Sequence, residues 1–338
     1  MLKIYTFILF TILLSACSYE KKPNLFSLTD IQKIAFGSCN KQDLDQSFWT
    51  TIQAMNPDLW IWLGDNIYAD TEDMSVMQAK YQQQKSNTYY QKFISDIPVT
   101  GIWDDHDYGQ NDGNRTFTYK NESKQHFLEF LDIPTDNPVN QYPGIYRSET
   151  IGQPPKQIKI IHLDTRTFQD PLVKTPKGAE KNYVTQVNGQ LLGAAQWQWL
   201  REELNNSKAD INIITSSLQV IAEDHRYEMW SNFPSQREQL FDLVVSSGAS
   251  NPLFMSGDRH LSEISELDWK GQNLVDITSS GLTHSFSGNK EFNRHRVGNL
   301  ITTESFSILT IDWSKQFIDL QQYDMQSNLL NSHLIGLK

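Results

Sequence analysis

The hydrophobic pattern along the chain alternates between short apolar runs and amphipathic stretches. The apolar runs predict β-strands at residues 31–39, 58–63, 97–103, 157–164 and 211–215. Apolar positions at helical spacing predict helices over residues 47–55, 74–95, 194–204 and 234–247. After the last of these helices the pattern changes to consecutive strands, at residues 253–255, 261–267, 274–278, 306–313 and 317–323. Strands that alternate with helices and then follow one another predict an α/β layered fold with mixed sheets.

The sequence contains no internal repeat, no low-complexity run and no long linker rich in Pro, Gly or Ser. We therefore expect one domain over residues 30–338. Two segments, residues 134–155 and 168–189, are rich in turn-forming residues. Long loops in a compact domain commonly border functional sites, so we expect these segments at the rim of a site.

The N-terminus has the pattern of an export signal. Lys3 precedes an apolar stretch from residue 4 to residue 16, which is too short to span a bilayer but fits the apolar region of a signal peptide. The ending Leu14-Ser15-Ala16-Cys17 resembles the lipobox of bacterial lipoproteins, in which cleavage precedes a cysteine that is then acylated. We expect a signal peptide over residues 1–16, a lipid on Cys17 and a tether over residues 17–29. The alternative is a plain signal peptide with an incidental cysteine.

This interpretation places the protein outside the cytoplasm. Several acyl chains on Cys17 would hold the domain on a bacterial membrane. Ser18 after that cysteine resembles the sorting signal of outer-membrane lipoproteins, so we expect the periplasmic face of the outer membrane. Cys39 is then the one remaining thiol, either inert and buried, or a ligand or nucleophile.

Composition excludes two classes of protein. Aromatic residues make up 12% of the chain, which is too many for a disordered protein. The 29 basic and 40 acidic side chains give a net charge of −11, and no basic cluster indicates a nucleic-acid-binding surface.

Four polar clusters each follow a predicted strand. They lie at residues 37–40, 64–68, 103–109 and 256–260. Because ligands of open α/β sheets bind beyond the carboxyl ends of strands, we expect these clusters to meet there. Asp104, Asp105 and Asp107 repel one another unless positive charge lies among them. Two arginines could supply that charge, but Cys, Asp, His and Tyr together form a mixed ligand set typical of a metal ion.

Within the clusters some residues are better candidates than others. In an extended strand Asp105 and Asp107 point one way and Asp104 and His106 the other, unless the strand breaks there. Of these we expect Asp105 to be the ligand. Taken singly, each cluster could also be a turn or a solvated loop, but four clusters at four strand ends favour a metal site.

The same residues carry a family resemblance. The chain resembles the PhoD-like alkaline phosphatases of the metallophosphoesterase superfamily from about residue 31 to residue 313. The motifs that carry it are Gly37-Ser38-Cys39, Leu63-Gly64-Asp65-Asn66-Ile67-Tyr68, residues 103–112 from Trp103-Asp104-Asp105-His106-Asp107 onward, Leu163-Asp164-Thr165-Arg166-Thr167, residues 192–200, Phe233-Pro234 and Ser256-Gly257-Asp258-Arg259-His260. Unlike better-known members, this protein is expected to have neither a twin-arginine signal nor a β-domain ahead of Gly37.

The resemblance implies a four-layer α/β/β/α sandwich with two mixed sheets and a centre containing iron and calcium. By motif position, Cys39 and Tyr68 would bind the iron and Asp65 would bridge the metals. The ligand set would be completed by Asp105, Asp258 and His260. His106 lies where the superfamily has a histidine near the leaving group.

The function that we expect is metal-dependent hydrolysis of phosphate mono- or diesters. A metal-bound hydroxide between ions bridged by Asp65 would be the nucleophile, and His106 the general acid. Arg166 is a candidate clamp for the phosphate, the alternative being an ion pair with Asp164. We expect His284 at the rim. Two other functions are compatible with the sequence: a phospholipase D-type phosphodiesterase, and a non-catalytic surface lipoprotein that binds metal or phosphate.

Overall fold

The computed structural model describes residues 24–338. The predicted signal peptide, residues 1–16, and Cys17 lie outside the described residues. The described end of the predicted tether forms a short 3₁₀ turn, η1 (Leu25–Ser27), and its Leu25 and Leu28 pack against the core between the sheets. Within residues 24–338 no helix is long and apolar enough to cross a membrane.

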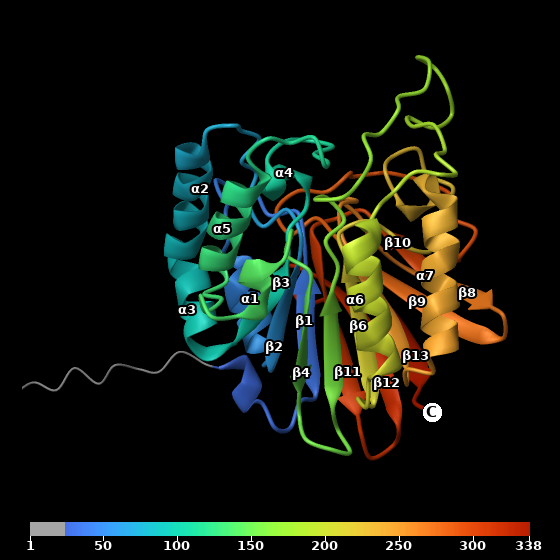
Figure 1. Ribbon diagram of the computed structural model, residues 1–338. Helices are drawn as coiled ribbons and strands as arrows, with labels where there is room; N and C mark the ends of the chain where they lie inside the picture. Colours follow the sequence, from blue (N-terminus) through green and yellow to red (C-terminus); the bar gives the residue numbers. More distant parts are fainter. Residues whose placement is uncertain (1–23) are drawn as a thin grey trace, which may run out of the picture.

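Two mixed sheets pack face to face in the middle of the molecule (Figure 1). The first has the strand order β13-β12-β11-β1-β2-β3, in which β1, β2 and β3 are parallel and the other pairings are antiparallel. Its strands are β1 (Lys33–Gly37), β2 (Leu59–Leu63), β3 (Val99–Ile102), β11 (Ser305–Asp312), β12 (Phe317–Asp324) and β13 (Leu329–Gly336).

The second sheet has the order β10-β8-β9-β7-β6-β5-β4, in which β5, β6, β7 and β9 are parallel. The pairings of β4, β8 and β10 are antiparallel. Its strands are β4 (Arg147–Ile151), β5 (Ile158–His162), β6 (Ile211–Ser216), β7 (Pro252–Ser256), β8 (Ser262–Trp269), β9 (Gln272–Ser279) and β10 (Arg296–Ile301).

Helices cover the outer face of each sheet (Figure 1). The first sheet is covered by α1 (Phe48–Ala54), α2 (Met74–Ser86), α3 (Thr88–Asp96) and α5 (Lys120–Phe130), and the second by α6 (Gly193–Asn205) and α7 (Pro234–Ser247). The short elements α4 (Asp105–Tyr108), η2 (Pro138–Gln141) and η3 (Trp230–Asn232) lie in connections. The four-layer α/β/β/α sandwich expected from the sequence is confirmed.

Because side chains of a strand alternate between its two faces, β2 contributes to two hydrophobic cores. In β2, Ile61 joins the aliphatic core between the sheets, whereas Trp60 and Trp62 point to the opposite face and pack under the helices. Trp49 of α1 contacts both tryptophans, with ring centroids 4.9 and 5.3 Å away. Because β2 is buried on both faces, it is held rigidly and can position the residues that follow it.

The structure differs from the predicted elements in several places. The helix predicted over residues 74–95 is two helices, because the backbone of Asn87 is not helical and its side chain caps α3 by accepting from the backbone N–H groups of Tyr89 and Tyr90. Strand β4 lies inside the segment predicted as loop at residues 134–155. The pattern did not indicate α5, β10 or β13.

Candidate metal centre

The candidate ligands lie in loops that follow the carboxyl ends of parallel strands. Cys39 follows β1 and Asp65 follows β2, while Asp105 opens α4 after β3. Asp258 and His260 follow β7 of the second sheet. The two sheets bring these ends together, so side chains that are far apart in the sequence meet in one site. The four clusters therefore converge where the fold class predicts a ligand site.

Four of these residues have left-handed backbone, the conformation that favours glycine. The angle φ is 60° at Cys39, 50° at Asp65, 58° at Asp258 and 51° at His260. Each such residue costs of the order of 1 kcal/mol or more and persists only where its surroundings hold it. Four of them around one point indicate that the geometry of this site is imposed by the fold.

Two glycines let the loops approach each other closely. A Cβ on Gly64, where φ is +98°, would lie 2.5 Å from Cβ of Asp104. A Cβ on Gly257 would lie 2.5 Å from the carbonyl oxygen of Leu63. Side chains at these positions would force the strand ends apart, and with them the carboxylates that follow.

The first group of ligand atoms combines sulfur, nitrogen and oxygen. The ligand atoms of Cys39, Asp65 and His260 all lie within 4.8 Å of one another. The Cys39 thiol donates to Asp65 Oδ2 at 3.4 Å, and the Tyr68 hydroxyl donates to the same oxygen at 3.2 Å. Tyr68 Oη also lies 2.9 Å from His260 Nε2. Cys39 of this group and the adjoining Tyr68 are the residues that the resemblance assigns to iron. The group also contains Asp65, the expected bridge, and His260.

The second group consists of carboxylates alone. Oxygens of Asp65, Asp104, Asp105 and Asp258 all lie within 4.8 Å of one another. Asp65 also forms a third group with Asp105 and His106. Asp65 belongs to all three groups. A carboxylate in this position can bridge two metal ions.

The electrostatics of the carboxylates favour a cation among them. Burial and then the Cys39 sulfur raise the pKa of Asp65 well above its usual value. Burial and the charge of Asp104 do the same to the pKa of Asp258. A bound cation would remove this penalty, because it stabilises the ionised carboxylates that otherwise take up protons.

Buried polar atoms without hydrogen-bond partners also indicate a metal centre. Asp65 Oδ1, Asp104 Oδ2 and His260 Nδ1 are buried and accept or donate no hydrogen bond within the described part of the chain. A buried polar atom without a partner costs about 1–3 kcal/mol, so native proteins rarely leave several in one place. The residues present therefore fit a centre that holds more than one metal ion.

His106 lies beside the shared carboxylate, on α4. Its Nδ1 is 2.7 Å from Asp70 Oδ1, and its ring lies 4.2 Å from the Tyr68 ring. Burial lowers the pKa of His106, but the charges of Asp65, Asp105 and Asp70 outweigh it and raise the pKa to about 10. These charges favour the protonated imidazole, and Asp70 fixes the orientation of the ring.

Arg166 does not form the ion pair with Asp164 that was considered from the sequence. Its guanidinium is fully buried, with Nε 2.5 Å from Asp104 Oδ1 and Nη2 2.6 Å from Glu228 Oε1. Only its backbone N–H donates to Asp164, at 3.0 Å. Because carboxylates occupy the guanidinium, the structure argues against a direct phosphate clamp. Arg166 instead neutralises part of the charge below the metal centre.

Three further carboxylates belong to the site although they were not among the expected ligands. Asp104 is in the second group, and Asp112 and Glu228 form a fourth group with Asp105, again within 4.8 Å. Burial raises the pKa of Glu228 to about 8. Asp112 is the last residue of the 103–112 motif, so that motif could have indicated it. No pattern in the sequence pointed to Glu228.

The directions of the side chains at residues 104–107 are set by a helix and not by the alternation of a strand. β3 ends at Ile102, and α4 turns Asp105 and His106 towards the site. Asp107 accepts from the backbone N–H of Asp104 at 2.6 Å and from the Asn66 side chain at 2.6 Å. Asp107 therefore fixes the loops and is not placed as a ligand.

His284 lies next to the candidate ligands. Its ring is 4.3 Å from that of His260 and 5.2 Å from that of Tyr68. Burial lowers the pKa of His284 to about 3, which leaves the imidazole neutral. The sequence analysis predicted His284 at the rim of the site, and in the structure its ring lies beside those of two candidate ligands.

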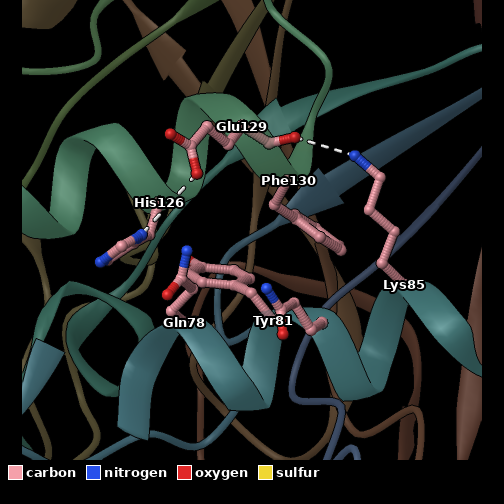
Figure 2. A pocket seen from close by; sticks show the side chains of 7 residues that line it. Gln78, Tyr81, Lys85, His126, Glu129 and Phe130 are labelled. Atoms are coloured by element: carbon pink, nitrogen blue, oxygen red, sulfur yellow. Dashed lines mark hydrogen bonds and ion pairs between the residues drawn. The ribbon is translucent and has the colours of Figure 1, made fainter. Parts of the chain in front are cut away.

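A separate pocket between α2 and α5 has none of this chemistry. Figure 2 shows Lys85 and His126 with Glu129 at its wall, where Lys85 Nζ donates to the Glu129 carbonyl oxygen at 2.8 Å. Its volume is about 190 Å³. None of the metal-ligand groups found within residues 24–338 lines it. The strand ends are therefore the better candidate for the functional site.

Comparison with known sequences agrees with this geometry. A sequence model of the PhoD-like phosphatases matches residues 34–305. Alkaline phosphatase D of Bacillus subtilis (strain 168) is 24% identical over 280 residues, which cover 69% of this chain and 46% of that protein. The chain thus spans about half the length of this curated relative.

Solved structures share the fold. One described as the structure of PhoD superposes with a TM-score of 0.71 at 19% identity, covering 93% of this chain and 70% of that one. A purple acid phosphatase from yellow lupin (Lupinus luteus) seeds has a TM-score of 0.60 at 13% identity, covering 93% and 55%. A dimetal phosphatase from Danio rerio has a TM-score of 0.55 at 11% identity, covering 91% and 99%.

Proposed function

The chain belongs to the PhoD-like phosphatase family, and on this basis we propose that it hydrolyses phosphate esters at the centre described above. The observation that carries the proposal is the position of Asp65, whose carboxylate is shared by three groups of metal-ligand atoms. A shared carboxylate between two cation sites is the arrangement that metal-assisted ester hydrolysis uses.

The two kinds of ligand group suit different metals. Sulfur, imidazole and phenol ligands from Cys39, His260 and Tyr68 suit iron, and the group of carboxylates around Asp105 and Asp258 suits calcium, which prefers oxygen. Bound ions would neutralise charge on the phosphoryl oxygens and lower the pKa of a coordinated water. The iron and calcium assignment is part of our proposal.

Residues of the chain supply proton transfer and rigidity. His106 is half-buried and held by Asp70, and the surrounding carboxylates favour its protonated form, so it can donate a proton to the leaving oxygen of the ester. Arg166 holds Asp104 and Glu228 in place without reaching the substrate. The left-handed backbone at Cys39 and Asp65 fixes the direction of both side chains.

The proposed acid can be tested through the leaving group. We expect His106→Gln to lower kcat for glycerol phosphate, whose alkoxide leaves poorly, by about 10²-fold. The loss for 4-nitrophenyl phosphate should be much smaller, because 4-nitrophenolate leaves without a proton. Steady-state rates on both esters, with metal content measured alongside, check this. An equal loss on both substrates would exclude the acid role, and a loss of metal would indicate a ligand.

The reaction itself is tested by removing the metals. We expect the purified protein to release phosphate from 4-nitrophenyl phosphate, to lose this activity with a chelator and to regain it with iron and calcium. Bis(4-nitrophenyl) phosphate in the same assay separates monoesterase from phosphodiesterase activity, including the phospholipase D-type alternative. Metal binding without turnover of any ester would favour the non-catalytic lipoprotein instead.

We also propose that the protein is exported and anchored by a lipid on Cys17. The support is the sequence of residues 1–17, which lie outside the described structure. We expect Cys17→Ser to move the protein from the membrane fraction to the soluble fraction, because acyl chains supply about 0.8 kcal/mol per buried CH₂. Fractionation followed by immunoblotting measures this. A variant that stays with the membrane would remove the anchor from the proposal.

A further inference from the structure

A second cavity of unusual charge lies beside the metal centre. It has a volume of about 320 Å³ and is formed mainly by residues 174–183 of the long loop after β5. Figure 1 shows this loop projecting from the end of the molecule where α4 also lies. Four cationic side chains line the cavity, Lys174, Lys177, Lys181 and Arg226, and no acidic residue within residues 24–338 does so.

The charge of these four side chains is not compensated. Lys181 Nζ donates to the carbonyl oxygen of Glu223 at 2.6 Å, and Arg226 Nε donates to Asn182 Oδ1 at 3.0 Å, so both use neutral partners. Lys174 and Lys177 are exposed, and their ammonium groups form no hydrogen bond or ion pair within residues 24–338. Other arginines of this protein behave differently. Arg166, for example, is held by two carboxylates.

This cluster of positive charge is unusual for this chain, whose net charge is −11. Several like charges around one small cavity create a positive potential that attracts anions. The nearest acidic residue in the sequence, Glu180, lines a neighbouring cavity instead. The arrangement therefore selects for an anionic ligand.

The cavity is connected to the metal centre by one side chain. Tyr183, which lines the cavity and is buried, donates its hydroxyl proton to Asp112 Oδ2 at 2.7 Å. Asp112 in turn belongs to the group of ligand atoms with Asp105 and Glu228. Tyr183 thus links the wall of the cavity to a carboxylate of the metal-ligand groups.

We propose that this cavity binds a second anionic group of the substrate, so that the preferred substrates are phosphate esters that carry a further phosphate or carboxylate. The inference rests on the proposed hydrolase function for its substrate. Lys174 and Lys177 hold the second anion, whereas the scissile phosphate lies at the metals. Lysine suits this role because its ammonium group is a compact charge on a flexible stem.

The test uses two sugar phosphates that differ by one phosphate group, fructose 1,6-bisphosphate and fructose 6-phosphate. In Lys174→Ala/Lys177→Ala we expect the ratio of their kcat/KM values to fall about tenfold, since two charge contacts are lost. Rates on fructose 6-phosphate and 4-nitrophenyl phosphate should stay unchanged. The matched control is Lys92→Ala/Lys208→Ala, which removes two exposed lysines elsewhere. An unchanged ratio in the cavity variant would overturn the proposal.

Calorimetric titration with fructose 1,6-bisphosphate separates this proposal from the proposed function. If no ester is hydrolysed but the cavity variant binds the bisphosphate about tenfold more weakly than the wild type, the hydrolase proposal fails and the anion site is supported. If wild type and cavity variant bind it equally, the anion site is excluded whether or not the protein is an enzyme.

Discussion

Asp65→Asn is expected to abolish ester hydrolysis and to reduce the metal content in the same variant. Asp65 contributes to three groups of ligand atoms, so its charge is shared by neighbouring cation sites. An amide has no charge to share, and its NH₂ group would point a donor at a cation or at the Cys39 sulfur. We expect kcat to fall at least about 10³-fold, because a metal centre supplies several kcal/mol of transition-state stabilisation.

The measurement is kcat on 4-nitrophenyl phosphate together with elemental analysis of the purified variant. Asp136→Asn, which changes an exposed aspartate in the same way, is the matched control and should keep full activity and metal. If Asp65→Asn retained both metals and full turnover, the carboxylate would not bridge them.

Arg166→Met is expected to destabilise the fold by about 3–5 kcal/mol, because it leaves Asp104 and Glu228 buried without their cation. Methionine occupies a similar space, so the effect measures charge and not volume. For a protein of this size the loss corresponds to a fall in Tm of roughly 5–8 °C. Thermal unfolding by circular dichroism checks it, with Arg166→Lys as the variant that keeps a charge.

Arg166→Met also distinguishes the buried counter-ion seen in the structure from the phosphate clamp considered from the sequence. A clamp that touched the phosphate would raise KM and leave Tm unchanged. A buried counter-ion lowers Tm, and KM on 4-nitrophenyl phosphate changes little in the protein that remains folded. Arg201→Met, an exposed arginine on α6, is the control and should change neither.

The sequence was most informative where strands end. The strands that precede the ligands are short and mostly apolar, β2 entirely so, and their ends could therefore be located and the polar residues after them recognised. The parallel arrangement then places such ends together, which is why Cys39, Asp65 and Asp258 could be grouped without a structure. The family resemblance added the metals and the role of each ligand.

Other features depend on contacts that the local pattern does not contain. Glu228 follows no strand, and it is brought to the site by its bond to Arg166. Arg166 itself lies after a strand like the ligands do, so only the structure shows that its guanidinium faces Asp104. At residues 104–107 the extended pattern gives way to α4, because Asp107 bonds back to the Asp104 backbone.

Missed elements have similar causes. The strand β13 is exposed along one face and joins the edge of the sheet by pairing with β12, so its residues show little hydrophobic periodicity. The helix α5 carries polar residues such as Lys124 that are buried by tertiary contacts, and these hide its apolar face. In both cases tertiary pairing decides the structure.

The central claim is that cations share the carboxylate of Asp65 at the strand ends. An anomalous difference map from crystals of the protein loaded with iron and calcium tests it directly. The account predicts two peaks on either side of Asp65, one beside Cys39 and His260 and one beside Asp105 and Asp258. A map with no peak at these residues, or with peaks only elsewhere on the protein, would contradict it.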